Sequence, residues 1–322
     1  MEQGLNGHWS STQSGIIVPN LLDTNKYYIF TVDELGGSHG LCYSEIDASL
    51  PGNGTTSNPL GDVTPGIKNI QLVTPVTEKL TAVLKPNLVE YWVITHYWGN
   101  KDFYAYEITQ AGVNTTPVIS SVGVIHTGAV INTVGYLKAS PLKNKLALVY
   151  RGTNSVYLYD FDNTTGIVSN ETQISLPGYL LYGIEFSKDG NYLFIAGEQN
   201  IIRYDVNTAV IDSVYIDDMS PFTPSYSAIR ALQLGPNGEI YVSIRYHDYL
   251  SVIHNPEAVN PVLTVDGVFL DIDGNGRNCR FGLPNIFYYK GWCTPSTNNE
   301  VNKIDTKKSS SILIRMQAFF IS

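Results

Sequence analysis

The sequence has few charged residues, few cysteines and no long apolar run. Only 15% of the 322 residues are charged, and the formal net charge is −9. The densest basic groups, at 143–145 and 305–308, are too small to hold a row of phosphates, so neither a nucleic acid nor an anionic membrane surface is an expected partner. No apolar stretch approaches the ~20 residues that cross a bilayer, so we expect no membrane insertion.

Helical periodicity is also scarce. Almost no segment shows the 3.6-residue spacing of apolar side chains, so very low helix content is expected. The first fifteen residues lack the basic and apolar regions of a signal peptide. These absences leave a chain rich in Tyr, Thr, Ser, Asn and Gly, which suits an exposed β-protein.

The three cysteines are Cys42, Cys279 and Cys293. No CxxC spacing exists, so a structural zinc site is not expected. Cys279 and Cys293 are close enough in sequence for a disulfide, which would imply an oxidising compartment. Three free, buried thiols are the alternative.

The segment 181–217 predicts four short strands in succession. Its first two apolar runs are separated by Lys188-Asp189-Gly190, and Asp-Gly between apolar runs is a strong hairpin signal. Tyr, Ile, Val and Phe dominate the runs, as expected for half-buried strands.

The same outline recurs along the chain at spacings of 47 to 67 residues. We expect five such units, at 27–73, 78–126, 134–176, 181–217 and 229–270. Four strands per repeat at this spacing predict an all-β fold, a β-propeller of four-stranded antiparallel blades with five blades readable. Two β-sandwich domains are the competing interpretation. The propeller makes 1–289 a single domain, in which the first blade is either complete or incomplete, followed by an irregular tail at 290–322.

Several segments resemble a known family. They include SSTQSGIIVPN, YYIFTVDELGG, LCYSEID, YWVITHYWGNKDFYAYEIT and YGIEFSKDGNYLF. They are similar to the N-terminal β-propeller region of large Bacteroidetes surface proteins, which often carry PKD-type domains and a gliding-motility or type IX secretion sorting domain. The resemblance implies secretion or cell-surface display, and six or seven blades in the complete family domain. The chain thus resembles a fragment or a short relative, and the family supplies no established catalytic residues.

One hairpin is rich in aromatic residues, most of which we expect to pack between blades. Tyr97 and Trp98 lie next to the turn at 99–101, so they are the best candidates for an exposed ligand-binding platform. Rings at such a turn can stack on a sugar or anchor a protein partner.

A second candidate site is a calcium loop. Asp271, Asp273 and Asn275 occupy the first, third and fifth positions of an EF-hand-like sequence, with Gly276 at the sixth. The twelfth position is Gly282 instead of the Glu that an EF-hand requires. An ordinary Asp/Gly-rich turn is therefore the alternative to bound calcium.

The other sequence patterns are weak indications of a catalytic or ligand-binding site. Residues 36–40 fit G-x-S-x-G but precede a strand instead of a helix, so a hairpin loop is expected there. The six histidines show no ligand spacing, although His96 and His247 follow second strands of different units. Acidic residues end several third strands (Asp47, Glu107, Asp160 and Asp205). There we expect them to cap turns.

Two functions remain. The first is a non-catalytic recognition or display module of an exported bacterial surface protein, which binds a protein or a glycan through its loop face. The second is a metal-dependent lyase or lactonase with its site in the central channel. The second requires several Asp, Glu, Asn or His side chains that converge on the channel.

Overall fold

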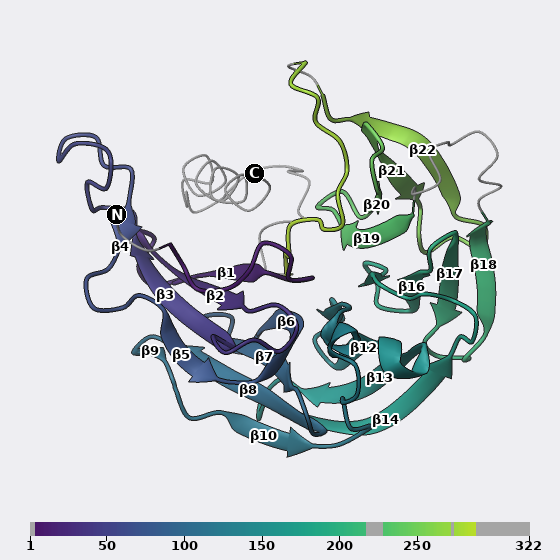
Figure 1. The fold of residues 1–322 in the computed structure, drawn as a ribbon, viewed down its shortest axis with the longest axis horizontal. Helices are drawn as coiled ribbons and strands as arrows, with labels where there is room; N and C mark the ends of the chain where they lie inside the picture. The colour runs from purple at the N-terminus through teal and green to yellow at the C-terminus, as the bar shows by residue number, and fades with distance from the viewer. Residues whose placement is uncertain (1–3, 217–227, 272–273, 288–322) are drawn as a thin grey trace.

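The computed structural model describes residues 4–216, 228–271 and 274–287. These residues form five antiparallel sheets around one axis, in chain order, which confirms the predicted β-propeller and its five blades (Figure 1). The tail predicted at 290–322 lies outside the described residues. The larger blade number of the resembled family is not reached by the part of the chain that the structure describes.

Blades 1 and 2 have split outer strands. Blade 1 contains β1 (Gly15–Pro19), β2 (Lys26–Val32), β3 (Leu41–Asp47), β4 (Asp62–Val63) and β5 (Ile70–Val73). Blade 2 contains β6 (Val76–Leu84), β7 (Tyr91–Tyr97), β8 (Asp102–Thr109), β9 (Gly112–Val113) and β10 (Val118–Ser121). The two short outer strands of each blade pair with the same third strand, β3 or β8.

Blades 3 to 5 have four strands each. Blade 3 contains β11 (Leu137–Ala139), β12 (Lys145–Tyr150), β13 (Ser155–Asp162) and β14 (Ile167–Ser175). Blade 4 contains β15 (Ile184–Phe186), β16 (Tyr192–Ala196), β17 (Asn200–Asp205) and β18 (Ile211–Ile216). Blade 5 contains β19 (Ile229–Leu234), β20 (Ile240–Ile244), β21 (Tyr249–His254) and β22 (Val262–Phe269).

Two short 3-10 helices, η1 (Val130–Thr133) and η2 (Arg151–Thr153), are the helical elements of the described residues. This confirms the expected scarcity of helix. None of the described helices is long and apolar enough to span a bilayer.

The predicted turn at 188–190 closes the first hairpin of blade 4. The Ser187 N–H donates to the Tyr192 carbonyl (2.8 Å), and Gly190 adopts a positive φ of 73°. The same turn position in blade 3 is occupied by Lys143 with φ 63°. Because glycine takes this conformation without a Cβ clash, the Asp-Gly pair is a reliable hairpin signal.

Apolar residues are buried between neighbouring blades. Separate clusters fill the interfaces of blades 1 and 2, 2 and 3, 3 and 4, and 4 and 5. The inner strands also contact one another in sequence, from β1 to β6, β11, β15 and β19. Each blade is therefore stabilised mainly by its neighbours, and blade 1 also has a small apolar cluster of its own (Ile17, Tyr27, Ile29 and Ile46).

The chain after blade 5 returns toward blades 1 and 2. In this bridging segment (residues 279–287), the Cys279 carbonyl accepts a hydrogen bond from the Tyr246 N–H of blade 5 (2.8 Å). At the other end, the Asn285 amide donates to the Leu80 carbonyl of β6 (2.8 Å), and the Phe287 ring packs edge-on against Tyr91. The segment thus links the last blade to the first two (Figure 1).

Candidate functional site

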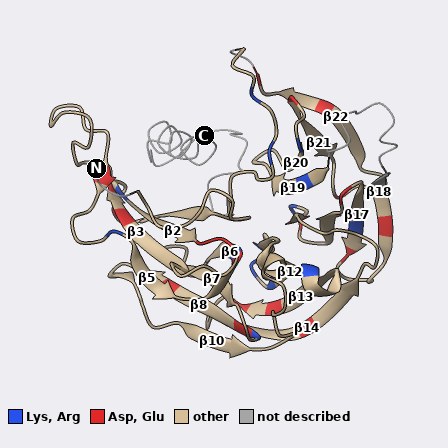
Figure 2. Ribbon diagram, in the orientation of Figure 1, with Lys and Arg blue, Asp and Glu red and all other residues tan. Residues whose placement is uncertain are grey.

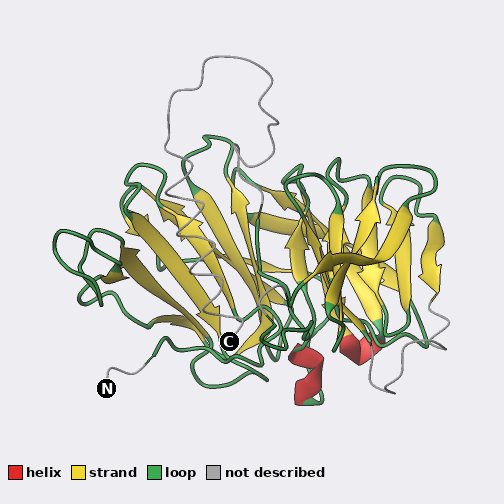
Figure 3. Cartoon of the chain, turned by 90° about the horizontal axis from the view of Figure 1, so that it is seen from above, coloured by secondary structure: helices red, strands yellow, loops and turns green. Residues whose placement is uncertain are grey.

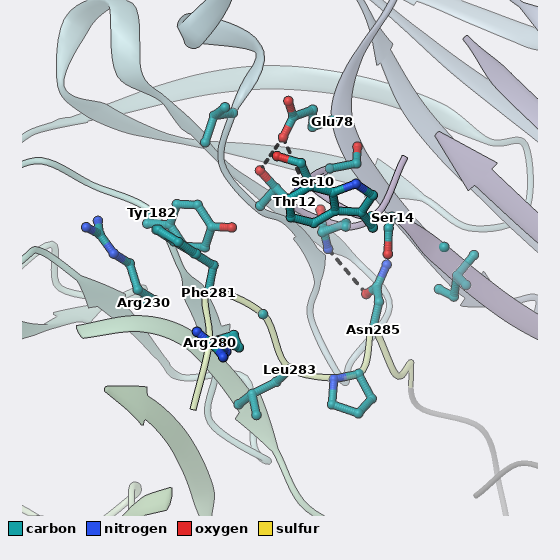
Figure 4. A pocket seen from close by; sticks show the side chains of 18 of the residues that line it. Ser10, Thr12, Ser14, Glu78, Tyr182, Arg230, Arg280, Phe281, Leu283 and Asn285 are labelled. Atoms are coloured by element: carbon teal, nitrogen blue, oxygen red, sulfur yellow. Dashed lines mark hydrogen bonds between the residues drawn. The ribbon is translucent and has the colours of Figure 1, made fainter. Parts of the chain in front are cut away.

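A cavity of about 800 Å³ opens at one end of the ring. Its walls come from residues 9–19, from blades 2 to 5 and from the bridging segment (Figure 4). The blade residues lie near the beginnings of inner strands or just after second strands. We call this end the cavity face. It also carries η1 and η2, which lie at one end of the ring in Figure 3.

Four of the seven arginines in the sequence line this cavity. Arg151 and Arg245 directly follow the second strands of blades 3 and 5. Arg230 is the second residue of β19, and Arg280 belongs to the bridging segment. Figure 2 marks basic positions on β19 and on the segment after β22, both of which border the centre of the ring. A chain with a net charge of −9 thus concentrates positive charge at its axis.

Aromatic rings hold these arginines in place. The ring of Phe281 contacts two guanidinium groups, with its centroid 5.2 Å from Cζ of Arg230 and 4.4 Å from Cζ of Arg245. The Tyr246 ring contacts Arg245 (4.3 Å) and Arg280 (5.5 Å). Cation–π contacts of this kind fix the plane of a guanidinium group while leaving its N–H edge available.

The hydrogen-bonding capacity of these arginines is only partly used. Arg230 pairs with Glu198 at 3.3 Å, and Arg245 donates to the Tyr246 hydroxyl. The Nε atoms of Arg230 and Arg245 are buried and have no acceptor among the described residues. Burial lowers the pKa of Arg230, and the charge of Arg151 acts in the same direction, while Glu198 opposes both.

The carboxylate of Glu78 is already hydrogen-bonded within the protein. It is buried, and it accepts hydrogen bonds from the Thr12 N–H (2.8 Å), the Thr12 hydroxyl (2.7 Å) and the Leu35 N–H (3.0 Å). Figure 4 shows the two bonds to Thr12 at the upper edge of the cavity. Glu78 therefore anchors the N-terminal segment to β6, and little of its acceptor capacity remains for a ligand.

Gln13 fixes the same segment to two inner strands. Its side-chain carbonyl accepts from the Leu80 N–H (3.1 Å) and the Leu137 N–H (2.7 Å), and its amide donates to the Leu137 carbonyl and to Asn285. One buried side chain thus joins β6, β11 and the bridging segment. The cavity wall is consequently a fixed surface and not a loose end of chain.

Trp9 lies at the rim of the cavity with 86% of its surface exposed. Its ring is tilted against the His8 ring at 5.3 Å. A large apolar ring that is exposed beside a cavity is unusual, because such rings are normally buried. The exposed ring of Trp9 is therefore available for stacking with a flat group of a ligand.

The predicted platform residues lie on the cavity face but do not line the cavity. Tyr97 is half-buried and stacks on Tyr104 at 5.7 Å, and the half-buried Trp98 packs against Gly36 of blade 1. Part of each ring is thus used for contacts within the protein. Ligand binding by Tyr97 and Trp98 stays a prediction.

The predicted calcium loop is only partly described. Asp271 accepts a hydrogen bond from the Arg277 N–H at 3.1 Å, which is the role of a turn-capping Asp. Asn275 is exposed, and Asp273 lies outside the described residues. Within the described ranges, no three His, Cys, Asp or Glu residues are grouped closely enough to hold a metal ion. Calcium at Asp271, Asp273 and Asn275 stays a prediction.

Cys279 is a free thiol in the structure. It is buried and donates to the Tyr249 carbonyl at 3.2 Å. Its predicted disulfide partner, Cys293, lies outside the described residues, so the pairing of Cys279 and Cys293 stays a prediction. Cys42 is likewise buried and free.

Two histidines form a buried stack between blades 2 and 3. The His126 ring lies between His96 (3.9 Å) and Tyr150 (4.2 Å), and both imidazoles are fully buried. Burial, together with the nearby charge of Lys79, lowers the pKa of His96 to about 3. Burial also holds the pKa of His126 well below its usual range. These histidines are core residues and not ligands at the rim.

Polar residues at equivalent positions, two of them charged, also connect the inner strands of blades 3 to 5. The ammonium group of Lys138 bonds to Glu185 (2.9 Å) and to Gln233 (2.7 Å), and all three side chains are buried. Glu185 further accepts from the Leu234 N–H at 3.1 Å. These polar groups satisfy one another around the axis.

The acidic residues at the ends of third strands have two roles. Asp47 and Asp205 accept hydrogen bonds from backbone N–H groups of the turns that follow, as predicted. Glu107 pairs instead with Lys85, which directly follows β6, and Asp160 pairs with Lys145 of β12. All four carboxylates therefore have structural partners.

Comparison with solved structures finds the same fold in bacterial proteins of low identity. A Bacteroides fragilis protein, provisionally named a 6-phosphogluconolactonase, is 14% identical with a TM-score of 0.51, over 79% of this chain and 70% of its own. The periplasmic gluconolactonase of Pseudomonas aeruginosa is 12% identical with a TM-score of 0.48, over 75% and 68%.

The extracellular domain of a hybrid two-component system from B. thetaiotaomicron is 12% identical with a TM-score of 0.45. It matches 87% of this chain, which spans 30% of that longer protein. No family model matches the chain, and no curated protein matches it. The match to the Bacteroides fragilis protein therefore shows the β-propeller fold and no more specific relationship.

Proposed function

We propose that this protein is the recognition module of an exported bacterial surface protein and that it binds a glycan in the cavity at the ring axis. The observation that carries the proposal is the exposed Trp9 ring beside a cavity of about 800 Å³. An enclosed site of this size suits a small ligand or the end of a chain better than a flat protein partner.

Binding is favoured over catalysis because of the state of the carboxylates. Glu78 accepts three hydrogen bonds from Thr12 and Leu35, and Glu198 pairs with Arg230. A general acid or base needs a carboxyl group that is available for the proton it transfers. These two are the carboxylates among the described residues of the cavity lining.

Export and surface display are part of the proposal on the strength of the sequence resemblance to Bacteroidetes surface propellers. Protease treatment of intact cells tests this part. Digestion of the protein on intact cells supports display, whereas protection until the cells are lysed contradicts it.

Two tryptophan variants distinguish ligand binding in the cavity from ligand binding at the platform predicted from the sequence. Trp9→Ala removes the exposed ring at the cavity, and Trp98→Ala removes a ring on the same face that does not line it. In a binding screen against oligosaccharides, we expect Trp9→Ala to weaken binding about tenfold or more and Trp98→Ala to leave it unchanged. The reverse result would assign binding to the Tyr97 and Trp98 platform. Binding of a protein but no oligosaccharide would replace the glycan with a protein partner.

A lactonase is the second candidate. The Bacteroides fragilis protein of the same fold bears a lactonase name, and that name describes that protein alone. Incubation with a sugar lactone, with and without added divalent metal, tests this alternative. Hydrolysis at a rate that Glu198→Gln abolishes would favour the enzyme, and no hydrolysis above the uncatalysed rate would remove it.

A further inference from the structure

The cavity lining has more arginines than acidic residues. Of the described residues that line it, four are arginines and two are glutamates. Glu78 is held by Thr12 and Leu35, which leaves Glu198 as the carboxylate paired with an arginine. The wall therefore carries a net positive charge.

Arg230 and Arg245 are the arginines that contact the Phe281 ring. Both guanidinium groups contact the same ring, which orients them before any ligand arrives. A guanidinium group held in this way presents a rigid pair of N–H donors that matches two oxygens of one anion. The binding of such an anion costs little ordering of the side chains.

The unused donors lie on these same two arginines. The Nε atoms of Arg230 and Arg245 are buried and have no acceptor in the described ranges. These two arginines therefore keep donor capacity that no acceptor of the described chain uses. Burial lowers the pKa of Arg230, and the charge of Arg151 acts in the same direction, which adds to the demand for negative charge.

We propose that the cavity binds the anionic substituent of an acidic saccharide, a carboxylate or a sulfate, at the Arg230 and Arg245 guanidinium groups beside Phe281, while Trp9 stacks on a sugar ring. The proposal rests on the proposed function, because it specifies the ligand of the same cavity. Carboxylate and sulfate can each present two oxygens to one guanidinium group. The substituent is therefore the specificity element, and the aromatic ring contributes contact area.

Calorimetric titration with three matched sugars tests the proposal. The probes are galacturonate trisaccharide, sulfated galactotriose and neutral galactotriose. We expect an acidic probe to bind and the neutral one to bind roughly 10- to 100-fold more weakly, since charge-assisted hydrogen bonds are the stronger kind. The acidic probe that binds more tightly identifies the substituent.

Matched variants assign the effect to these residues. Arg230→Gln and Arg245→Gln should each weaken the acidic probe about tenfold or more and leave the neutral probe unchanged. Arg277→Gln removes the same charge from an exposed position outside the cavity and should have no effect. Arg230→Lys keeps the charge but loses the paired donors, so it should recover only part of the affinity. The Tm of each variant confirms that it is folded.

Three outcomes overturn the inference. Equal binding of neutral and acidic probes refutes it and leaves the proposed function intact. Acidic binding that survives both glutamine variants places the anion elsewhere and also refutes it. Absence of binding by all three probes contradicts the inference and the proposed function together.

Discussion

The buried histidine stack predicts that the protein loses stability in mild acid. His96 and His126 are fully buried, and burial keeps the pKa of His96 at about 3 and that of His126 well below 6.5. The unfolded chain binds protons at both imidazoles below pH ~6.5, whereas the folded chain does not. The free energy of unfolding therefore falls as the pH decreases below that value.

The size of the loss follows from the pKa difference. Between pH 7 and pH 5, each histidine that stays neutral in the folded state costs about 2 kcal/mol of stability. Two such residues cost about 4 kcal/mol. That is a large part of the stability of an ordinary domain.

Replacement of one ring isolates the effect. His126→Phe keeps an aromatic ring between His96 and Tyr150, and the backbone bonds of residue 126 with Gly99 and Asn100 do not involve the side chain. We expect this variant to lose only about half as much stability between pH 7 and pH 5.

The assay is urea unfolding followed by circular dichroism at both pH values. His39→Gln, which alters an exposed histidine, serves as the control and should keep the full loss. Equal stability of the wild type at pH 7 and pH 5, or a full loss in His126→Phe, would show that the stack is not the source of acid sensitivity.

Three further predictions concern the axis and the loops. Lys138→Met leaves the buried Glu185 carboxylate without its ion-pair partner, so we expect a loss of about 3–5 kcal/mol of unfolding free energy in urea. A second change, Glu185→Gln, should restore part of this loss. Phe287→Ala removes the edge-on contact of the bridging segment with Tyr91, so we expect a loss of about 3 kcal/mol of unfolding free energy by the same assay. A loss near zero would mean that the bridging segment does not stabilise the ring of blades. If the loop at 271–276 binds calcium, the Tm rises with calcium over EDTA and Asp271→Ala abolishes the rise, whereas an unchanged wild-type Tm dismisses the site.

The blades could be predicted because their signals are local. The turn at 188–190 and the apolar runs on either side of it lie within fifteen residues, and the repeat multiplies that signal along the chain. The split outer strands of blades 1 and 2 gave no such signal, because β4, β5, β9 and β10 are too short for a visible alternation.

The cavity could not be predicted because its residues meet only in the folded ring. Trp9 lies far from Arg230 and Arg280 in the sequence, and no spacing rule connects them. One signal was present: Arg151, Glu198 and Arg245 recur at 47-residue intervals, just after the second strands of three blades. Charged residues at one point of a repeat face the same end of a propeller. Trp98 follows a second strand as well, but there the loop of blade 1 covers it.

The bridging segment has a consequence for the order in which the molecule forms. Its bonds join Asn285 to Gln13 and Leu80, across 272 and 205 positions of the chain. Contacts between such distant residues form late, and during synthesis they wait until the last blade has been made. Until then Tyr91 lacks the ring of Phe287 and the cavity lacks its Arg280 and Phe281 wall. A nascent chain that stalls before residue 279 would hold most of its blades yet present an uncovered apolar seam, which is the surface that a chaperone binds.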